Sequence, residues 1–110
     1  MTTVHEIFDR MPETFLKEKA AGMDAVIQFD ITGDGGGLWH AVIAGERLSV
    51  ARGPHPSPQL TLCASAEDYV AISTGRLNGQ LAFMTGRLKA SGDLALAIKM
   101  QTVFKQPARR

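Results

Sequence analysis

Apolar and polar positions alternate with the period of β-strands through the middle of the chain. In residues 24–32, Ile27, Phe29 and Ile31 fall on one face and polar side chains fall on the other. Glycine-containing turns separate the first segments, and a proline-rich loop at residues 53–58 precedes the last. This pattern predicts a meander of antiparallel strands. The four predicted strands span residues 24–32, 38–44, 47–51 and 59–64.

Helical periodicity precedes and follows the strands. Thr3 and Glu6 fit a capping box at the start of the first helix. Pro12 lacks an N–H group and disfavours helical geometry at Met11, so we expect a break there and a second short helix to about Lys19. The apolar face of the first segment holds Val4, Ile7, Phe8, Met11 and Phe15. Two further short helices are predicted after Ser65, ending at Gly75, and over residues 79–85.

The last third of the chain predicts a strand at residues 86–90, a turn at 91–93 and a helix over 94–104. Asp93 is placed to cap this helix by accepting backbone N–H bonds. A helix that is apolar over most of its circumference is buried or is covered by another apolar surface. Its broad apolar face holds Leu96, Ala97, Met100, Val103 and Phe104, and a second apolar patch holds Leu94 and Ile98.

This order of elements predicts an α+β fold, with a mostly antiparallel sheet of about five strands covered by helices. The helices are the elements available to cover the apolar face of the sheet. A chain of 110 residues suits a single domain, residues 1–110, with one modest core.

Composition narrows the class of protein. Apolar residues are 45% and charged residues 21%, the balance of an ordinary globular protein. The single cysteine, Cys63, excludes an internal disulfide, and the polar first residues do not resemble a signal peptide, so we expect a cytoplasmic protein. Residues 1–50 hold four Lys or Arg against eight Asp or Glu, and residues 51–110 hold eight against three. One interpretation of the basic half is transient contact with an anionic membrane surface. The other is a solvated surface with uneven charge, because the basic residues form no compact run.

No arrangement of residues points to catalysis or to metal binding. His5, His40 and His55 lack other ligand residues at metal-binding spacing. The glycine-rich residues 33–37 lack the Lys and Ser or Thr of a phosphate loop and predict a hairpin turn. Aromatic residues are only 6%, and Trp39 has no basic neighbour in the sequence, which disfavours nucleic-acid binding. We therefore expect no enzymatic activity, no metal, no cofactor and no nucleic-acid partner.

The C-terminal third resembles the sterol carrier protein-2 family. The resemblance rests on the segments 75–77 and 82–86, a strand with the pattern G-x-L-K, a Gly-Asp turn, and an Ala/Leu/Met helix that closes on Phe104. It is more specific there than in the N-terminal half, where only the order of elements agrees. The resemblance implies a sheet under helices, with an apolar tunnel between them that the terminal helix helps to form.

The resemblance also implies a function, namely non-catalytic binding of a lipid and its transfer between membranes. The ligand would be a fatty acid, a fatty acyl-CoA, or a sterol-like or isoprenoid lipid. Periodicity alone favours the simpler interpretation that the same residues pack against the sheet. Gln80, Gln101 and Tyr69 are candidates for a polar mouth of the tunnel. The candidate lipid-binding residues are Tyr69, Leu77, Leu81, Phe83, Met84, Leu96, Met100, Gln101, Val103 and Phe104.

Two other functions stay open at this point. The chain would act as an interaction or accessory module for a lipid-biosynthetic enzyme or assembly, through protein–protein contacts, as a monomer or a homodimer. A small enzyme without a cofactor would need a polar cluster that folding brings together.

Overall fold

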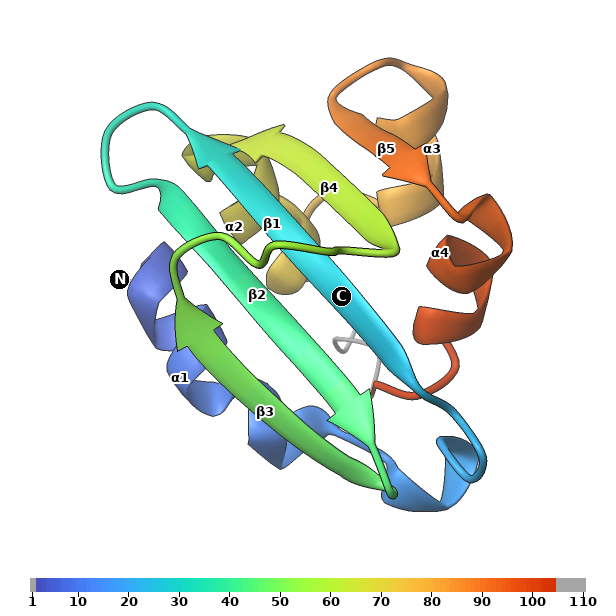
Figure 1. Cartoon of the computed structure of the whole chain (residues 1–110). Coiled ribbons are helices and arrows are strands. Elements are labelled where there is room, and N and C mark those ends of the chain that lie inside the picture. Colours follow the sequence, from blue (N-terminus) through green and yellow to red (C-terminus); the bar gives the residue numbers. More distant parts are fainter. Residues whose placement is uncertain (1, 105–110) are drawn as a thin grey trace.

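The structure, a computed structural model, describes residues 2–104, in which five strands form one sheet with helices beside it (Figure 1). In chain order the elements are α1 (Val4–Thr14), a 3₁₀ turn (Lys17–Lys19), β1 (Ala25–Thr32), β2 (Gly37–Ala44), β3 (Arg47–Arg52), β4 (Leu60–Ser65), α2 (Ala66–Ser73), α3 (Gly79–Met84), β5 (Leu88–Gly92) and α4 (Leu94–Met100). The predicted α+β class is therefore confirmed.

The sheet has the spatial order β3-β2-β1-β4-β5, with β3 and β5 at its edges. It is mostly antiparallel, as predicted, but β4 pairs in parallel with β1 rather than extending the meander from β3. The connection from β3 to β4 crosses the sheet in front of β2 and β1 (Figure 1). It is held by a hydrogen bond of 3.1 Å from the backbone N–H of His55 to Gln28 Oε1 and by one of 2.9 Å from the N–H of Gln59 to the carbonyl of Val26.

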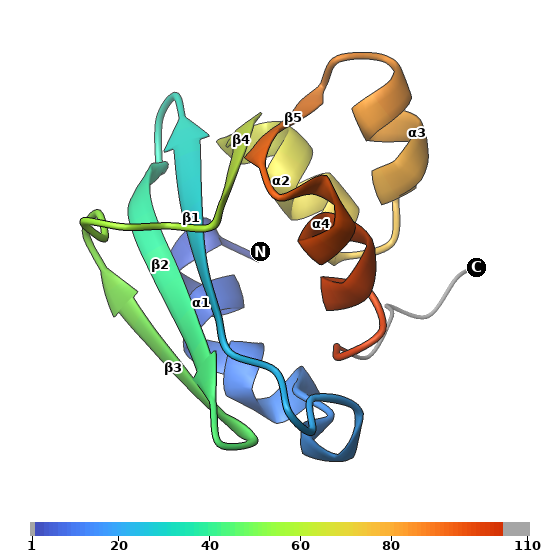
Figure 2. The ribbon, with the colours of Figure 1, turned by 45° about the vertical axis from the view of Figure 1, so that its right-hand side comes forward.

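The core lies between one face of the sheet and the helices α1, α2 and α4 (Figure 2). Alternate residues of β1, β2 and β4 are buried on this face, as the sequence alternation predicts. Phe8 from α1 is 1% exposed and lies at its centre, with its ring stacked on Trp39 at 4.6 Å and on Tyr69 at 5.3 Å. Aromatic contacts thus join α1 and α2 to the sheet.

Trp39 does have a basic neighbour in space, although it has none in sequence. The pairing of β2 with β3 places Arg52 opposite Trp39, and the guanidinium carbon lies 5.2 Å from the centroid of the indole ring. This geometry is a cation–π contact within the fold.

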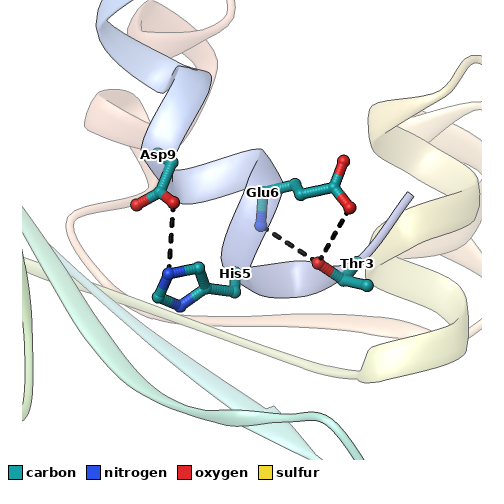
Figure 3. Close-up of polar contacts among 4 residues, drawn as sticks. All are labelled: Thr3, His5, Glu6 and Asp9. Carbon is teal, nitrogen blue, oxygen red and sulfur yellow. Dashed lines mark hydrogen bonds and ion pairs between the residues drawn. The ribbon is translucent and has the colours of Figure 1, made fainter. Parts of the chain in front are cut away.

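Helix α1 begins as predicted, with Thr3 as its N-cap. The Thr3 hydroxyl accepts the N–H of Glu6 at 3.1 Å and donates to the Glu6 carboxylate at 3.5 Å (Figure 3). The Glu6 side chain therefore reaches the cap hydroxyl rather than the cap N–H. His5 and Asp9 lie one turn apart on the exposed side, with Nε2 of His5 3.1 Å from the Asp9 carboxylate, a contact that is an ion pair when the imidazole is protonated (Figure 3).

The predicted helix break at Met11 is wrong. Helix α1 continues through Pro12 to Thr14, and only a 3₁₀ turn follows it. Pro12 lies in the last turn, where it removes a single hydrogen bond, to the carbonyl of Phe8. Burial of Met11 and Phe8 against the sheet holds the backbone helical despite this loss.

Strand β5 lies two residues further along the chain than predicted. Gly86 and Arg87 precede it, and Ser91 and Gly92 pair with β4 rather than forming a turn. Gly92 has a φ of 103°, and a Cβ there would lie 2.4 Å from the carbonyl oxygen of Gln59. Only glycine fits this close approach of two backbones. Asp93 then caps α4 as predicted, since its carboxylate accepts the N–H of Leu96 at 3.1 Å.

Helix α4 ends at Met100, earlier than the predicted end at Phe104. The chain leaves the helix to pair with the segment after α1. Phe104 forms a β-bridge with Phe15, and the N–H of Leu16 donates to the carbonyl of Val103 at 2.7 Å. These contacts, between residues far apart in sequence, replace helical hydrogen bonds. No helix within residues 2–104 is long and apolar enough to cross a membrane.

Candidate functional site

The ten predicted lipid-binding residues do not form one cluster, because the fold divides them by burial. Five lie in the core or pack against it, and we call these five the interior group. Leu77 is half-buried and lies outside the core cluster. Leu81, Phe83, Met84 and Gln101 are exposed. The interior group consists of Tyr69, Leu96, Met100, Val103 and Phe104.

Four members of the interior group lie on α4 or in the segment that follows it, and Tyr69 lies on α2. Leu96 is 8% exposed and Val103 is fully buried, whereas Met100 and Phe104 are half-buried and pack against the same core. Helix α4 contacts β4 and β5, and the turn after it reaches α1 through Phe15.

Tyr69 supplies the polar group of the interior. Its ring stacks on Phe8 and meets Phe29 edge-on at 6.1 Å. Burial raises the pKa of the Tyr69 hydroxyl well above its usual range, and a hydrogen bond with Ser73 offsets part of this rise. The hydroxyl is therefore neutral, and it lies inside the core rather than at the predicted polar mouth.

The exposed candidates belong to a larger apolar surface on α3 and α4. Ala82 is fully buried against β5, so its neighbours on α3 project sideways or outward. Leu96 is the buried residue of α4, and Leu94 and Ile98 lie on the opposite side of that helix. The sequence identified these last two as a second apolar patch but not as site residues. We call this area the α3–α4 surface, and its members are Leu81, Phe83, Met84, Leu94 and Ile98.

Two open depressions on the surface are lined by none of the ten predicted residues. One of about 600 Å³ lies between the start of α1, the β1–β2 turn and α2. The other, of about 380 Å³, lies between β4, the start of α2 and the turn before β5. The first is lined by Thr2, Thr3, Val4, Asp34, Gly35, Ala66, Glu67, Val70, Thr74 and Arg76, and the second by Thr32, Cys63, Ala64, Ser65, Asp68, Gly86, Arg87 and Lys89.

Polar groups suited to chemistry are scattered. The rings of His40 and His55 lie 5.3 Å apart on the outer side of the sheet, where Nδ1 of His40 bonds the carbonyl of Gly53. Nδ1 of His55 accepts the N–H of Ser57, so both rings fix the connection between β3 and β4. Within residues 2–104, no group of three or more His, Cys, Asp or Glu could hold a metal ion.

The sequence matches a known family over almost its full length. A sequence model of the SCP-2 sterol transfer family matches residues 4–105. Hydroxysteroid dehydrogenase-like protein 2 of Mus musculus is 31% identical over 104 residues, which are 94% of this chain and 21% of the mouse protein. The Homo sapiens protein of the same name is 28% identical, over 94% of this chain and 25% of that protein. The chain thus spans about a fifth to a quarter of these curated relatives.

Solved structures agree with the fold. The solution structure of palmitated SCP2L2 from Aedes aegypti has a TM-score of 0.73 at 25% identity, covering 99% of this chain and all of that one (100%). The crystal structure of Aedes aegypti SCP2-L2 has a TM-score of 0.66 at 28% identity, with 92% and 95% coverage. The sec-alkylsulfatase Pisa1 from Pseudomonas sp. has a TM-score of 0.81 at 17% identity, covering 99% of this chain and 17% of the sulfatase, and shows the fold alone.

Proposed function

Because the chain belongs to the SCP-2 sterol transfer family, a family of lipid-binding domains, we propose that it binds a single lipid between its sheet and α4. The observation that carries the proposal is the interior group, whose apolar members on and after α4 pack against the core within the segment that the family model matches. Met100 contributes an unbranched thioether side chain that adapts to apolar partners of varied shape.

A fatty acid is the ligand that we propose first. The Aedes aegypti relative has been solved as a palmitated protein, which supports an acyl ligand here. Fatty acyl-CoA, sterol-like and isoprenoid lipids are the other candidates. An acyl chain of about 15 methylenes costs on the order of 12 kcal/mol to expose to water, so desorption from a membrane is slow. A protein interior with apolar walls replaces the contacts that the acyl chain loses when it leaves the membrane. Transfer between membranes then needs no chemical reaction.

Uptake of an acyl chain requires the interior group to separate from the sheet, because Leu96 and Val103 are packed into the core. We propose that α4 moves outward to admit the ligand. The helix has only seven residues, and beyond its contacts with β4 and β5 it is tied to α1 through the Phe15–Phe104 bridge. A short helix with few partners is the element of this sheet-and-helix core that opens at least cost.

The test compares two tryptophan substitutions on α4. Met100→Trp fills the proposed binding space, so affinity for a fluorescent fatty acid in vesicle-free buffer should fall about tenfold or more. Ile98→Trp is the matched control, because Ile98 is 71% exposed and faces away from the sheet. Circular dichroism and thermal unfolding establish that both variants keep the fold. Equal, wild-type affinity in both folded variants would contradict binding beside Met100.

A second candidate function is that of an accessory module within a larger enzyme or assembly. Its support is the length of the curated relatives, since the matched segment is only 21% of the mouse protein. Native mass spectrometry, with organic extraction of the purified chain, separates the two candidates. A stoichiometric lipid supports the carrier and identifies the ligand class. An empty chain that takes up no offered fatty acid supports the accessory module.

A further inference from the structure

The α3–α4 surface exposes more apolar side chain than the fold explains. Met84 is 74% exposed and Ile98 is 71% exposed, and the other three members are between 48% and 52% exposed. Single exposed apolar residues are ordinary, but five on two neighbouring elements are not. Both helices contact the edge strand β5 and lie together on one side of the molecule (Figure 2).

Two basic residues, Arg87 and Lys99, lie close to members of this surface along the chain. Residues 74–104 hold four basic residues against one acidic residue, Asp93, which caps α4. Lys99 follows Ile98 on α4, and Arg87 lies in the turn that leaves α3. All four basic residues are exposed. Arg76 lines the first surface depression with Asp34 and Glu67, and Arg87 and Lys89 line the second with Asp68, whereas Lys99 lies on α4 itself.

The N-terminal half of the chain has the opposite charge. Residues 1–50 carry a balance of −4, four basic residues against eight acidic ones. Helix α1 from this half contacts β3, the sheet edge away from β5. Its own apolar residues Val4, Phe8 and Met11 are buried in the core and are not available to any partner.

We propose that the α3–α4 surface docks on a membrane that contains anionic lipids. The exposed apolar side chains would contact the acyl chains of such a membrane, and the basic side chains near them would contact its negative head groups. The acidic α1 side is repelled from the same head groups, so the charge asymmetry selects the orientation. Docking concerns residues outside the interior group and does not require ligand uptake.

The test measures sedimentation of the 110-residue chain with vesicles, without added fatty acid. The vesicles are phosphatidylcholine alone and phosphatidylcholine mixed with phosphatidylserine. Ile98→Gln removes an apolar contact without adding charge, and glutamine keeps helix propensity. Its partition onto the anionic vesicles should fall about tenfold, whereas wild type should bind them better than the neutral ones. Leu38→Gln is the matched control, because Leu38 is 42% exposed on the outer face of the sheet.

Three results would overturn the proposal. They are no binding of wild type to anionic vesicles, an equal loss in the Leu38→Gln variant, or self-association of wild type that Ile98→Gln abolishes. The last result would assign the surface to a second copy of the chain. Fatty-acid binding in vesicle-free buffer is measured on the same variants. Its persistence in Ile98→Gln separates failure of docking from failure of the proposed lipid site.

Discussion

At the scale of single residues, Tyr69 reports on the integrity of the interior. It is the only tyrosine in the chain, so phenolate absorbance reads this one hydroxyl. Burial raises its pKa, whereas the unfolded chain ionises near its usual value of about 10. Folding stability is therefore unaffected below about pH 10 and falls as pH rises above it, because the unfolded state loses the proton first.

We predict that the folded chain shows no phenolate absorbance at pH values where the urea-unfolded chain is half-ionised. Phenolate should appear only together with loss of the fold, followed by circular dichroism. Tyr69→Phe should remove this contribution to alkaline unfolding while leaving the contacts of the ring with Phe8 in place. A titration midpoint near 10 in the folded chain would mean that the hydroxyl is accessible to water.

At the scale of elements, the start of α4 depends on Asp93. The helix is only seven residues long, so the N–H group that Asp93 satisfies is a large share of its hydrogen bonding. Asp93→Ala should lower the free energy of unfolding by about 1 kcal/mol, measured by urea denaturation. Asp93→Asn keeps a cap acceptor and should cost only a few tenths of that. Equal losses in both variants would assign the effect to the charge rather than to the cap.

The elements themselves were largely predictable because their signals are local. The alternation in residues 24–32, the caps at Thr3 and Asp93 and the helix start after Ser65 act within a few positions of the chain, and the structure confirms them. The wrong element ends have long-range causes. Pro12 stays helical because Met11 is buried against the sheet, and α4 ends early because Phe104 pairs with Phe15.

At the scale of the whole molecule, the parallel pairing of β1 with β4 and the division of the candidate site were not predictable. Periodicity shows which residues share a face, but not which face the rest of the chain covers. Leu96 and Ile98 are both large and apolar and stand two positions apart, yet one is buried and the other is exposed. Only the position of α4 beside β4 and β5 distinguishes them.

The uneven distribution of charge is also a property of the whole molecule. It predicts that the position of a basic residue affects membrane binding more than the net charge of the chain does. Arg87→Glu with Lys99→Glu, and Arg10→Glu with Arg47→Glu, lower the net charge equally, and all four positions are exposed. The first pair lies beside the α3–α4 surface, whereas the second lies on α1 and on the opposite edge strand β3.

Each basic residue near an anionic surface contributes about 1 kcal/mol, so the first pair should weaken binding to anionic vesicles by about a hundredfold or more. The second pair should have a much smaller effect, because its charges stand away from the docked surface and are screened beyond about 10 Å at 0.1 M salt. Vesicle sedimentation at low and high salt measures both, and the difference should vanish near 1 M salt, where screening acts within about 3 Å. Equal losses at low salt would mean that only net charge attracts the chain, and that α3 and α4 do not meet the membrane.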